Sequence, residues 1–243
     1  MVTNVTSSNS RKTVVTGGSS GIGLAVVNGL LSRGHDVTVF DLTNHPDPTV
    51  PTEIVNVVEE EATARAVERT RERYGGLTGL VASHGTRGVF KPALEMTADE
   101  VRSQFDVHAI GSFIVAREFA RVCDGSGSIV FVSSTTAYGG WANQVDYGLA
   151  KAAVSQLTKN LAIEWAPRGI RVNAVAPGHT LTPMVQDMVD SGYDLSETER
   201  RMPLGRLAQP EEIAHSITHL LDDATFVTGQ CLAVDGGWTS VGK

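Results

Sequence analysis

Tyr147 and Lys151 lie four residues apart in the segment "YGLAK", a spacing that places both side chains on one face of a helix. A phenol has an ordinary pKa of about 10, so a tyrosine alone is a poor base at neutral pH. A neighbouring ammonium group favours the phenolate, and such a pair is suited to exchange a proton with a substrate hydroxyl or carbonyl group. Because the pair also arises by chance on surface helices, its context in the sequence must support the assignment.

Ser134 provides part of that context. It stands thirteen residues before Tyr147, at the end of "IVFVSS", a short apolar segment typical of a buried strand. If the strand ends at the same sheet edge, the serine can donate a hydrogen bond to a substrate oxygen. The segment "NAVAPGHTLT" ends another strand beside the same crevice.

A glycine-rich segment, "TGGSSGIG", lies between the first expected strand and an amphipathic helix. Gly17, Gly21 and Gly23 lack the Cβ atoms that would prevent a pyrophosphate from approaching backbone N–H groups and the helix N-terminus. An ordinary glycine-rich turn is the alternative. The position between strand and helix favours a dinucleotide-binding loop.

Asp41 ends the second expected strand. Its carboxylate can accept hydrogen bonds from both hydroxyl groups of an adenosine ribose and would repel a 2′-phosphate, which favours NAD over NADP. The neutral residues Ser20 and Leu42 agree with this preference. The alternative is an aspartate that merely faces solvent.

Short apolar segments alternate with amphipathic helices along the whole chain. The alternation predicts a single-domain α/β protein with a doubly wound Rossmann fold, a parallel β-sheet flanked by helices on both faces. The expected strands are residues 12–18, 35–41, 53–58, 77–85, 127–134, 170–178 and 231–237, and the expected helices are residues 22–32, 61–75, a long helix that begins near Thr97, 145–166 and 209–223. Residues 1–11 are expected to form a flexible arm before the Rossmann-type domain, residues 12–243. Three prolines in residues 43–52 predict a loop where a longer chain would have a helix.

The composition excludes several classes of function. A formal net charge of -7 argues against nucleic-acid and anionic-membrane surfaces, which need clustered Lys and Arg. No apolar segment approaches the ~18 residues of a membrane span, and the first residues lack the apolar core of a signal peptide, so a cytoplasmic protein is expected. The two cysteines and seven histidines have no metal-site or disulfide-framework spacing, so no metal is expected.

Taken in order, TGxxxGxG, the acid after the second strand, Ser134, YxxxK, NxxxPGxxxT and "VDGG" resemble the short-chain dehydrogenase/reductase family over nearly the whole chain. The resemblance implies that Ser134 polarises the substrate oxygen, that Tyr147 is the acid/base, and that Lys151 lowers the pKa of the tyrosine and binds the nicotinamide ribose. It also implies that Pro177, Thr180 and Thr182 hold the carboxamide of the cofactor. The full expected cofactor site is Gly17, Ser19, Ser20, Gly21, Ile22, Gly23, Asp41, Asn56, Val57, Ser83, Gly85, Tyr147, Lys151, Pro177, Thr180 and Thr182.

The chain departs from the family pattern at two positions. "ASHG", which contains Ser83, His84 and Gly85, replaces the usual "NNAG". His108 replaces the fourth catalytic residue, usually an Asn whose main-chain carbonyl holds a water of the proton relay. A lone histidine on an apolar helix face is also commonly a hydrogen-bonded core residue. We expect His108 in the relay, through either its main-chain carbonyl or its imidazole.

These features predict an NAD-dependent oxidoreductase that oxidises a secondary alcohol or cyclic diol to a ketone. The alternatives are an NADPH-dependent ketone or 3-oxoacyl reductase and a non-catalytic dinucleotide-binding sensor. The Pro-rich connection after Asp41 and the "PGHTLT" turn resemble family members that oxidise cyclic dihydrodiols.

The expected substrate contacts are Ser134, Tyr147, Trp141 and Asn143, beneath a mobile lid at about residues 184–203. Trp141 could instead only pack under the lid. The expected partners are a small-molecule alcohol or ketone and further copies of the chain, since the family resemblance implies a homotetramer.

Overall fold

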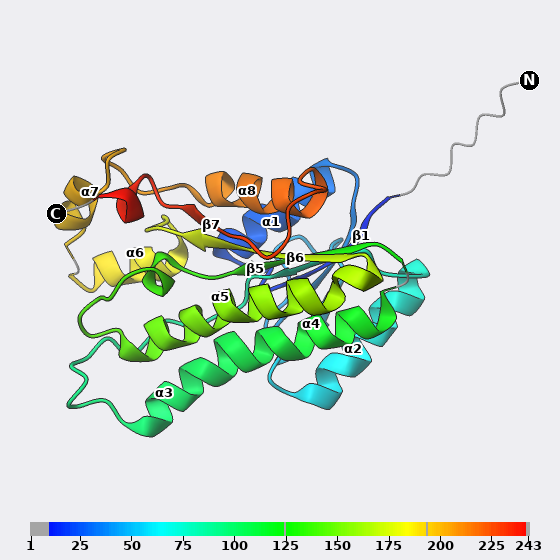
Figure 1. Cartoon of the computed structure of the whole chain (residues 1–243), viewed down its shortest axis with the longest axis horizontal. Helices are drawn as coiled ribbons and strands as arrows, with labels where there is room; N and C mark the ends of the chain where they lie inside the picture. The colour runs from blue at the N-terminus through cyan, green and yellow to red at the C-terminus, as the bar shows by residue number, and fades with distance from the viewer. Residues whose placement is uncertain (1–9, 124, 193, 242–243) are drawn as a thin grey trace, which may run out of the picture.

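The architecture is a seven-stranded sheet in which every neighbouring pair of strands is parallel (Figure 1). The structure is a computed structural model that describes residues 10–123, 125–192 and 194–241. The strands lie in the order β3-β2-β1-β4-β5-β6-β7, as the doubly wound prediction requires. Their bounds are β1 Lys12–Thr16, β2 Asp36–Asp41, β3 Thr52–Ile54, β4 Gly79–Ala82, β5 Gly127–Val132, β6 Ile170–Pro177 and β7 Cys231–Val234.

Helices cover both faces of the sheet. Helices α1 and α8 pack on one face, and α2, α4 and α5 pack on the other (Figure 1). The helix bounds are α1 Gly21–Ser32, α2 Glu60–Tyr74, α3 Ala98–Phe105, α4 Gly111–Val122, α5 Val145–Trp165, α6 Pro183–Asp190, α7 Ser196–Arg201 and α8 Pro210–Asp222. Within these described segments, no helix is both long and apolar enough to cross a membrane.

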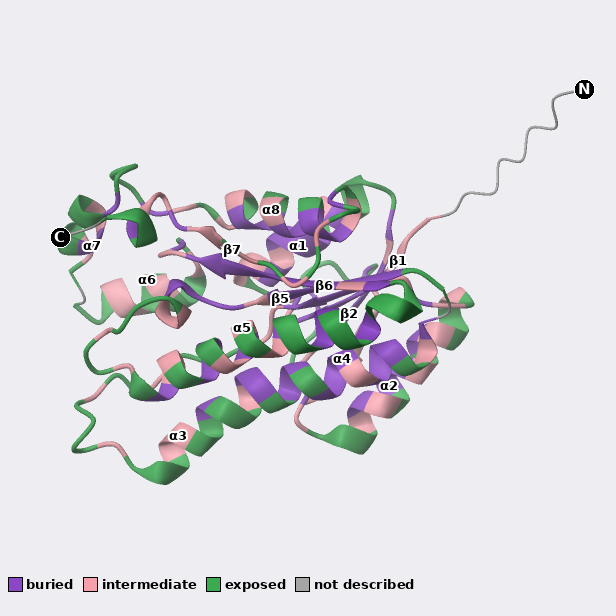
Figure 2. Ribbon diagram, viewed as in Figure 1, coloured by how far each residue is buried: buried purple, intermediate pink, exposed green. Residues whose placement is uncertain are grey.

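Two apolar layers fix the sheet between the helices. Val26 and Ile213 pack on one face, and Phe119 and Phe131 belong to the layer on the other, all at most 1% exposed. Burying a side chain of this size stabilises the fold by about 1.5–3 kcal/mol. Figure 2 shows the sheet and the inward helix faces as buried and the outward faces as exposed. The carboxyl ends of the strands are therefore held firmly.

The third strand is shorter than predicted. It covers Thr52–Ile54 instead of residues 53–58. The Val55 N–H still donates to the Asp41 carbonyl, but the Asn56 carbonyl accepts from the Glu59 N–H and turns the chain into α2. The preceding loop contains no helix, as the prolines predict.

The long helix expected after Thr97 is present and contains a π-helical turn. Its capping box is confirmed, because the Thr97 hydroxyl accepts from the Glu100 N–H and the Glu100 carboxylate accepts from the Thr97 N–H. Asp106–Ile110 then forms a π-helical turn between α3 and α4, with the Gly111 N–H donating to the Asp106 carbonyl. The predicted long helix is therefore confirmed over Ala98–Val122, and the wider turn within it, which was not predicted, contains His108.

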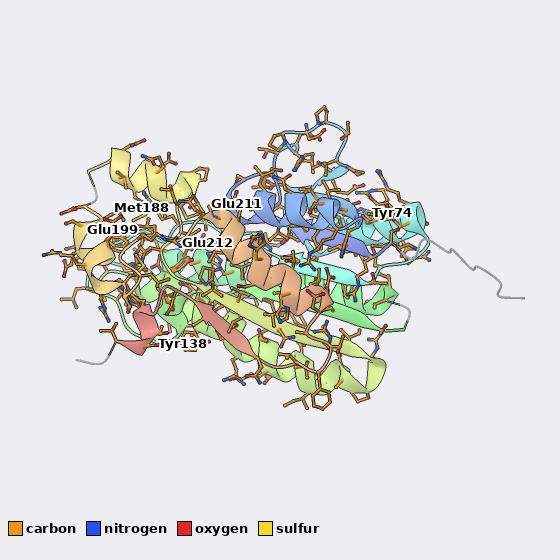
Figure 3. The ribbon with its side chains drawn as sticks, turned by 90° about the horizontal axis from the view of Figure 1, so that it is seen from above. Tyr74, Tyr138, Met188, Glu199, Glu211 and Glu212 are labelled. Carbon is orange, nitrogen blue, oxygen red and sulfur yellow. The ribbon has the colours of Figure 1, made fainter. Side chains whose placement is uncertain are left out.

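Two further segments were expected from the sequence, an N-terminal arm at residues 1–11 and a lid at about residues 184–203. Residues 1–9 of the expected arm lie outside the described residues, whereas Ser10 bonds to Asp36 and Arg11 pairs with Asp222. The expected lid contains α6 and α7. Figure 3 shows Met188 of α6 and Glu199 of α7 at one end of the molecule, with Tyr74 at the other.

Candidate active site

A cavity of about 510 Å³ opens at the carboxyl edge of the sheet, among the loops that follow β1, β2, β4, β5 and β6. Its size is that of a typical small-molecule site. Most of the residues predicted from the sequence line it, namely Gly17, Ser20, Gly21, Ile22, Gly23, Asp41, Asn56, Val57, Ser83, Gly85, His108, Ser134, Trp141, Tyr147, Lys151, Pro177, Thr180 and Thr182. Ser19 and Asn143 do not line it.

The glycine loop leaves the N-terminus of α1 open to the cavity. Gly17 has a φ of 66°, and a Cβ on it would lie 2.7 Å from the His84 Cα. A Cβ on Gly23 would lie 2.0 Å from the Gly17 carbonyl oxygen, so only glycine fits there. Ser20, the residue before the helix, makes no side-chain cap. The backbone N–H groups of the first turn are thus available to an anion such as a pyrophosphate.

Asp41 is oriented by the backbone around it. Its Oδ2 accepts from the Ser19 N–H at 3.0 Å and its Oδ1 accepts from the Leu42 N–H at 2.7 Å. Ser19 therefore acts through Asp41 and not as part of the cavity wall. A carboxylate has further acceptor positions, so Asp41 can still accept hydrogen bonds from ribose hydroxyl groups.

Ser134, Tyr147 and Lys151 meet where β5 ends and α5 begins. The Lys151 Nζ donates to the Val132 carbonyl at 2.8 Å and lies 5.6 Å from the centre of the Tyr147 ring. Lys151 is 4% exposed and Ser134 is 9% exposed. Ser134 and Lys151 are thus buried, Tyr147 is half-buried, and all three line the cavity.

Burial controls the protonation of this group. It raises the pKa of Tyr147 to about 12, although a hydrogen bond with Ser134 acts to lower it. Burial also lowers the pKa of Lys151 to about 7. The protein therefore favours the neutral phenol of Tyr147 and leaves the Lys151 amine about half protonated near pH 7. The lowered Tyr147 pKa that the family resemblance implies needs an additional positive charge in the cavity.

His84 joins the loop after β4 to the π-helical turn. Its Nδ1 pairs with the Thr16 hydroxyl at 2.5 Å, and its Nε2 lies 3.1 Å from the Val107 carbonyl. Since a carbonyl only accepts, Nε2 carries the proton and Nδ1 accepts from Thr16. Burial, followed by the charge of Lys151, lowers the pKa of His84 to about 4. His84 is thus a neutral link between strand and turn.

His108 is nearly inaccessible, with 2% of its surface exposed. Its Nε2 donates to the Thr86 carbonyl at 3.0 Å, while its Nδ1 has no hydrogen-bond partner within the described part of the chain. Burial, followed by the charge of Lys151, lowers the pKa of His108 to about 2. The imidazole is therefore neutral throughout the physiological pH range, which argues against the possibility that it titrates near neutral pH.

An aromatic wall closes another part of the cavity. Trp141 and His179 line the cavity, and the buried Trp238 packs behind both. Trp238 stacks on Trp141 with 5.9 Å between ring centres, and its ring centre lies 5.3 Å from that of His179. Trp141 lines the cavity and also packs in one apolar cluster with Val185 and Leu195 of the expected lid, so its contact with a substrate stays a prediction. Asn143 is exposed and Gln144 lines the cavity instead.

Trp238 and His179 were absent from the residues predicted from the sequence. Trp238 follows the "VDGG" motif and His179 lies within "PGHTLT", so both stood beside recognised motifs. Their contact with Trp141 depends on tertiary packing between distant segments. No periodic pattern could have predicted it.

Comparison with protein families gives a match over residues 17–239 to the family model described as enoyl-(acyl carrier protein) reductase. The cis-4-hydroxycyclohexanecarboxylate dehydrogenase of Sinomonas cyclohexanicum is 37% identical over 95% of this chain and 97% of that protein. The 2,5-dichloro-2,5-cyclohexadiene-1,4-diol dehydrogenase of Sphingobium indicum is 34% identical over 94% of this chain and 96% of that protein.

An uncharacterized short-chain type dehydrogenase/reductase of Sinorhizobium fredii is 36% identical, and the alignment covers 96% of this chain but 44% of that protein. Among solved structures, levodione reductase superposes with a TM-score of 0.90 at 30% identity. That superposition covers 96% of this chain and 98% of the other. The similarity therefore extends over the sheet, the glycine loop and the segments that contain Ser134, Tyr147 and Lys151.

Proposed function

This chain belongs to the short-chain dehydrogenase/reductase family, whose members are oxidoreductases that use NAD(P), and we propose that it is an NAD-dependent dehydrogenase of a cyclic secondary alcohol. The observation that carries the proposal is that Ser134, Tyr147 and Lys151 line the same cavity as the glycine loop and Asp41. A cofactor site and a proton-transfer site thus share one cavity.

In the proposed reaction the substrate hydroxyl lies between Ser134 and Tyr147. Ser134 donates a hydrogen bond to the substrate oxygen, and Tyr147 accepts the hydroxyl proton as the ketone forms. Bound NAD supplies the positively charged nicotinamide ring that accepts a hydride from the carbinol carbon. The overall reaction converts a secondary alcohol and oxidised NAD into a ketone, NADH and a proton.

Lys151 has two tasks in this proposal. Its position 5.6 Å from the Tyr147 ring lets a protonated amine stabilise the developing phenolate. Its amine also lies on the cavity wall, where it is available to hydroxyl groups of the nicotinamide ribose. His108 borders the same space, and its main chain in the π-helical turn is the proposed continuation of the proton relay.

The preference for NAD rests on Asp41. Its oriented carboxylate accepts from the ribose hydroxyl groups, whereas a 2′-phosphate would bring a second negative charge against it. Leu42, next to it, is exposed and uncharged and offers that phosphate no compensating contact. Of the residues expected at the cofactor site, Ser19 contributes indirectly, because its backbone N–H donates a hydrogen bond to the Asp41 carboxylate.

Two observations support a cyclic substrate, namely the apolar lining of the cavity and the substrates after which two relatives are named. Trp141, Met184 and Met188 give that part of the cavity a broad apolar lining suited to a carbocycle. The printed names of the Sinomonas and Sphingobium relatives both specify six-membered carbocycles that bear a hydroxyl group. Residues 184–203 act as the lid over this substrate in the proposal, and Asn143 lies outside its contacts.

A homotetramer completes the proposal. Phe113 on α4 and Leu149 and Ile163 on α5 are large apolar side chains exposed on the outer helical layer. An exposed apolar surface of this kind is typical of a subunit contact. Sedimentation analysis tests it, and a monomeric mass would contradict it.

The proposed function is tested by incubating the protein with NAD or NADP and cyclic secondary alcohols, and following reduced cofactor by absorbance. We expect reduction of NAD, with a much smaller kcat/KM for NADP. Preference for NADPH with ketones as the only substrates would contradict the proposal.

A further inference from the structure

We infer that His179 determines specificity by forming a hydrogen bond with a second hydroxyl group of a cyclic substrate, so that the preferred substrate is a cyclic diol. The inference rests on the proposed dehydrogenase function. It concerns a side chain that the proton-transfer chemistry of Ser134, Tyr147 and Lys151 does not use.

The backbone around His179 is firmly placed. The His179 carbonyl accepts from the Ala208 N–H at 3.0 Å, and Thr180 forms a bridge with Ala208. The Thr180 hydroxyl donates to the Gly178 carbonyl at 3.0 Å. The turn after β6 therefore presents His179 at the cavity wall in a defined position.

The ring of His179 is packed but its nitrogens are unused. Trp238 lies 5.3 Å away at an angle of 46°, and Trp238 is itself covered by Trp141 and by the Arg201 guanidinium, which lies 4.4 Å from its ring centre. Within the part of the chain that the structure describes, neither ring nitrogen of His179 forms a hydrogen bond. A half-buried imidazole left in this state favours a ligand that supplies the missing partners.

The chemistry of the ring selects the ligand group. Burial lowers the pKa of His179, so the imidazole is neutral at neutral pH and offers one donor and one acceptor. A hydroxyl group also donates and accepts, and it is the group best matched to this pair of functions.

The lining around His179 is otherwise suited to a hydrocarbon ring. Trp141, Met184, Val185 and Met188 also line the cavity and are apolar or aromatic. His179 reaches the cavity from a different loop than Ser134 and Tyr147. A substrate with one hydroxyl at Tyr147 and another at His179 satisfies both polar sites while its ring contacts the apolar wall.

The test compares kcat/KM for cyclohexanol with the values for cyclohexane-1,2-, 1,3- and 1,4-diols in the wild type and in His179→Phe, which keeps a flat ring but removes both nitrogens. The wild type is expected to prefer at least one diol by about threefold to tenfold, equivalent to about 0.7–1.4 kcal/mol. His179→Phe should lower the ratio of kcat/KM for the preferred diol to kcat/KM for cyclohexanol to about one.

Two further variants separate recognition from folding. His179→Gln retains a donor and an acceptor and should keep most of the diol preference. His215→Gln changes an exposed histidine on α8 and should behave as the wild type. If His179→Phe does not fold, the wild type is compared on cyclohexane-1,2-diol and on 2-methylcyclohexanol, in which a methyl replaces the second hydroxyl, and the diol is expected to be preferred.

The outcomes distinguish the two proposals. Equal wild-type activity on cyclohexanol, the methyl compound and all three diols would overturn the role of His179 and leave the dehydrogenase function intact. An unchanged diol preference in His179→Phe would do the same. Absence of NADH from every alcohol, despite NAD binding, would contradict the proposed function and this inference together.

Discussion

The ring of His108 packs edge-on against the ring of Tyr147, with 5.2 Å between the ring centres and 88° between their planes. The same imidazole donates from Nε2 to the Thr86 carbonyl. Its one firm hydrogen bond is thus to the loop after β4, and its contact with Tyr147 is one of packing. The His108 side chain therefore supports the position of the Tyr147 ring by packing against it. Two of the predictions below rest on this contact.

His108→Asn should retain substantial activity, because the packing role and the main-chain relay do not require an imidazole. We expect kcat to remain within about tenfold of the wild type, measured by NADH formation. A loss of more than about a hundredfold, in a variant whose circular dichroism is unchanged, would indicate that the imidazole performs specific proton transfer.

The pH dependence of the wild type should contain no contribution from His108. Its pKa of about 2 leaves it neutral at every working pH. The profiles of kcat/KM for the wild type and His108→Asn should therefore show the same inflections above about pH 5. An inflection between about pH 6 and 7 that disappears in the variant would contradict the assignment.

Sequence reasoning anticipated the parallel sheet and many of the residues that line the cavity because both follow from local patterns. The spacing from Tyr147 to Lys151 fixes a shared helix face, and the Gly17 to Gly23 segment marks a strand-to-helix junction. Each of these signals lies within a single element or a single connection.

Features that depend on several elements were not anticipated. The π-helical turn around His108 differs from an α-helix by one additional residue and has no pattern of its own. The early end of β3 depends on the turn at Asn56, and the Trp141–Trp238 stack joins two loops that are distant in sequence. These are tertiary effects, which a single sequence shows only weakly.

Lys151→Met should change how stability depends on pH. Burial lowers the pKa of Lys151 from 10.5 to about 7, so between these values the unfolded chain binds one more proton than the folded chain. The free energy of unfolding therefore rises with pH in this window by up to about 1.4 kcal/mol per pH unit, and below about pH 7 this contribution to the slope vanishes. Tyr147, with its raised pKa, acts in the opposite direction only above about pH 10.

The measurement is urea unfolding of the cofactor-free protein at about pH 7.5 and 9, where the wild type should gain about 2 kcal/mol more than Lys151→Met. Lys159→Met removes an exposed lysine from the same helix and serves as the control. Equal pH slopes in the wild type and Lys151→Met would show that Lys151 titrates normally.

Asp41→Asn should weaken the discrimination between cofactors. The amide keeps an acceptor oxygen for one of the two neighbouring N–H groups and removes the charge that repels a 2′-phosphate. We expect the ratio of NAD to NADP affinity, measured by calorimetry, to fall by about tenfold or more. Asp36→Asn, at the amino end of the same strand, is the control. An unchanged ratio in Asp41→Asn would assign the preference to other residues.

The central claim is that Tyr147 exchanges the substrate proton while NAD accepts the hydride. Its most direct test is the stoichiometry of NADH and ketone formed from a cyclic secondary alcohol by the wild type and by Tyr147→Phe, with NAD binding measured on both. The account predicts equal amounts of NADH and ketone from the wild type, at least about a hundredfold lower kcat in Tyr147→Phe, and a much smaller change in NAD affinity than in kcat. Undiminished turnover in Tyr147→Phe, or a wild type that binds NAD and forms no NADH with any such alcohol, would contradict it.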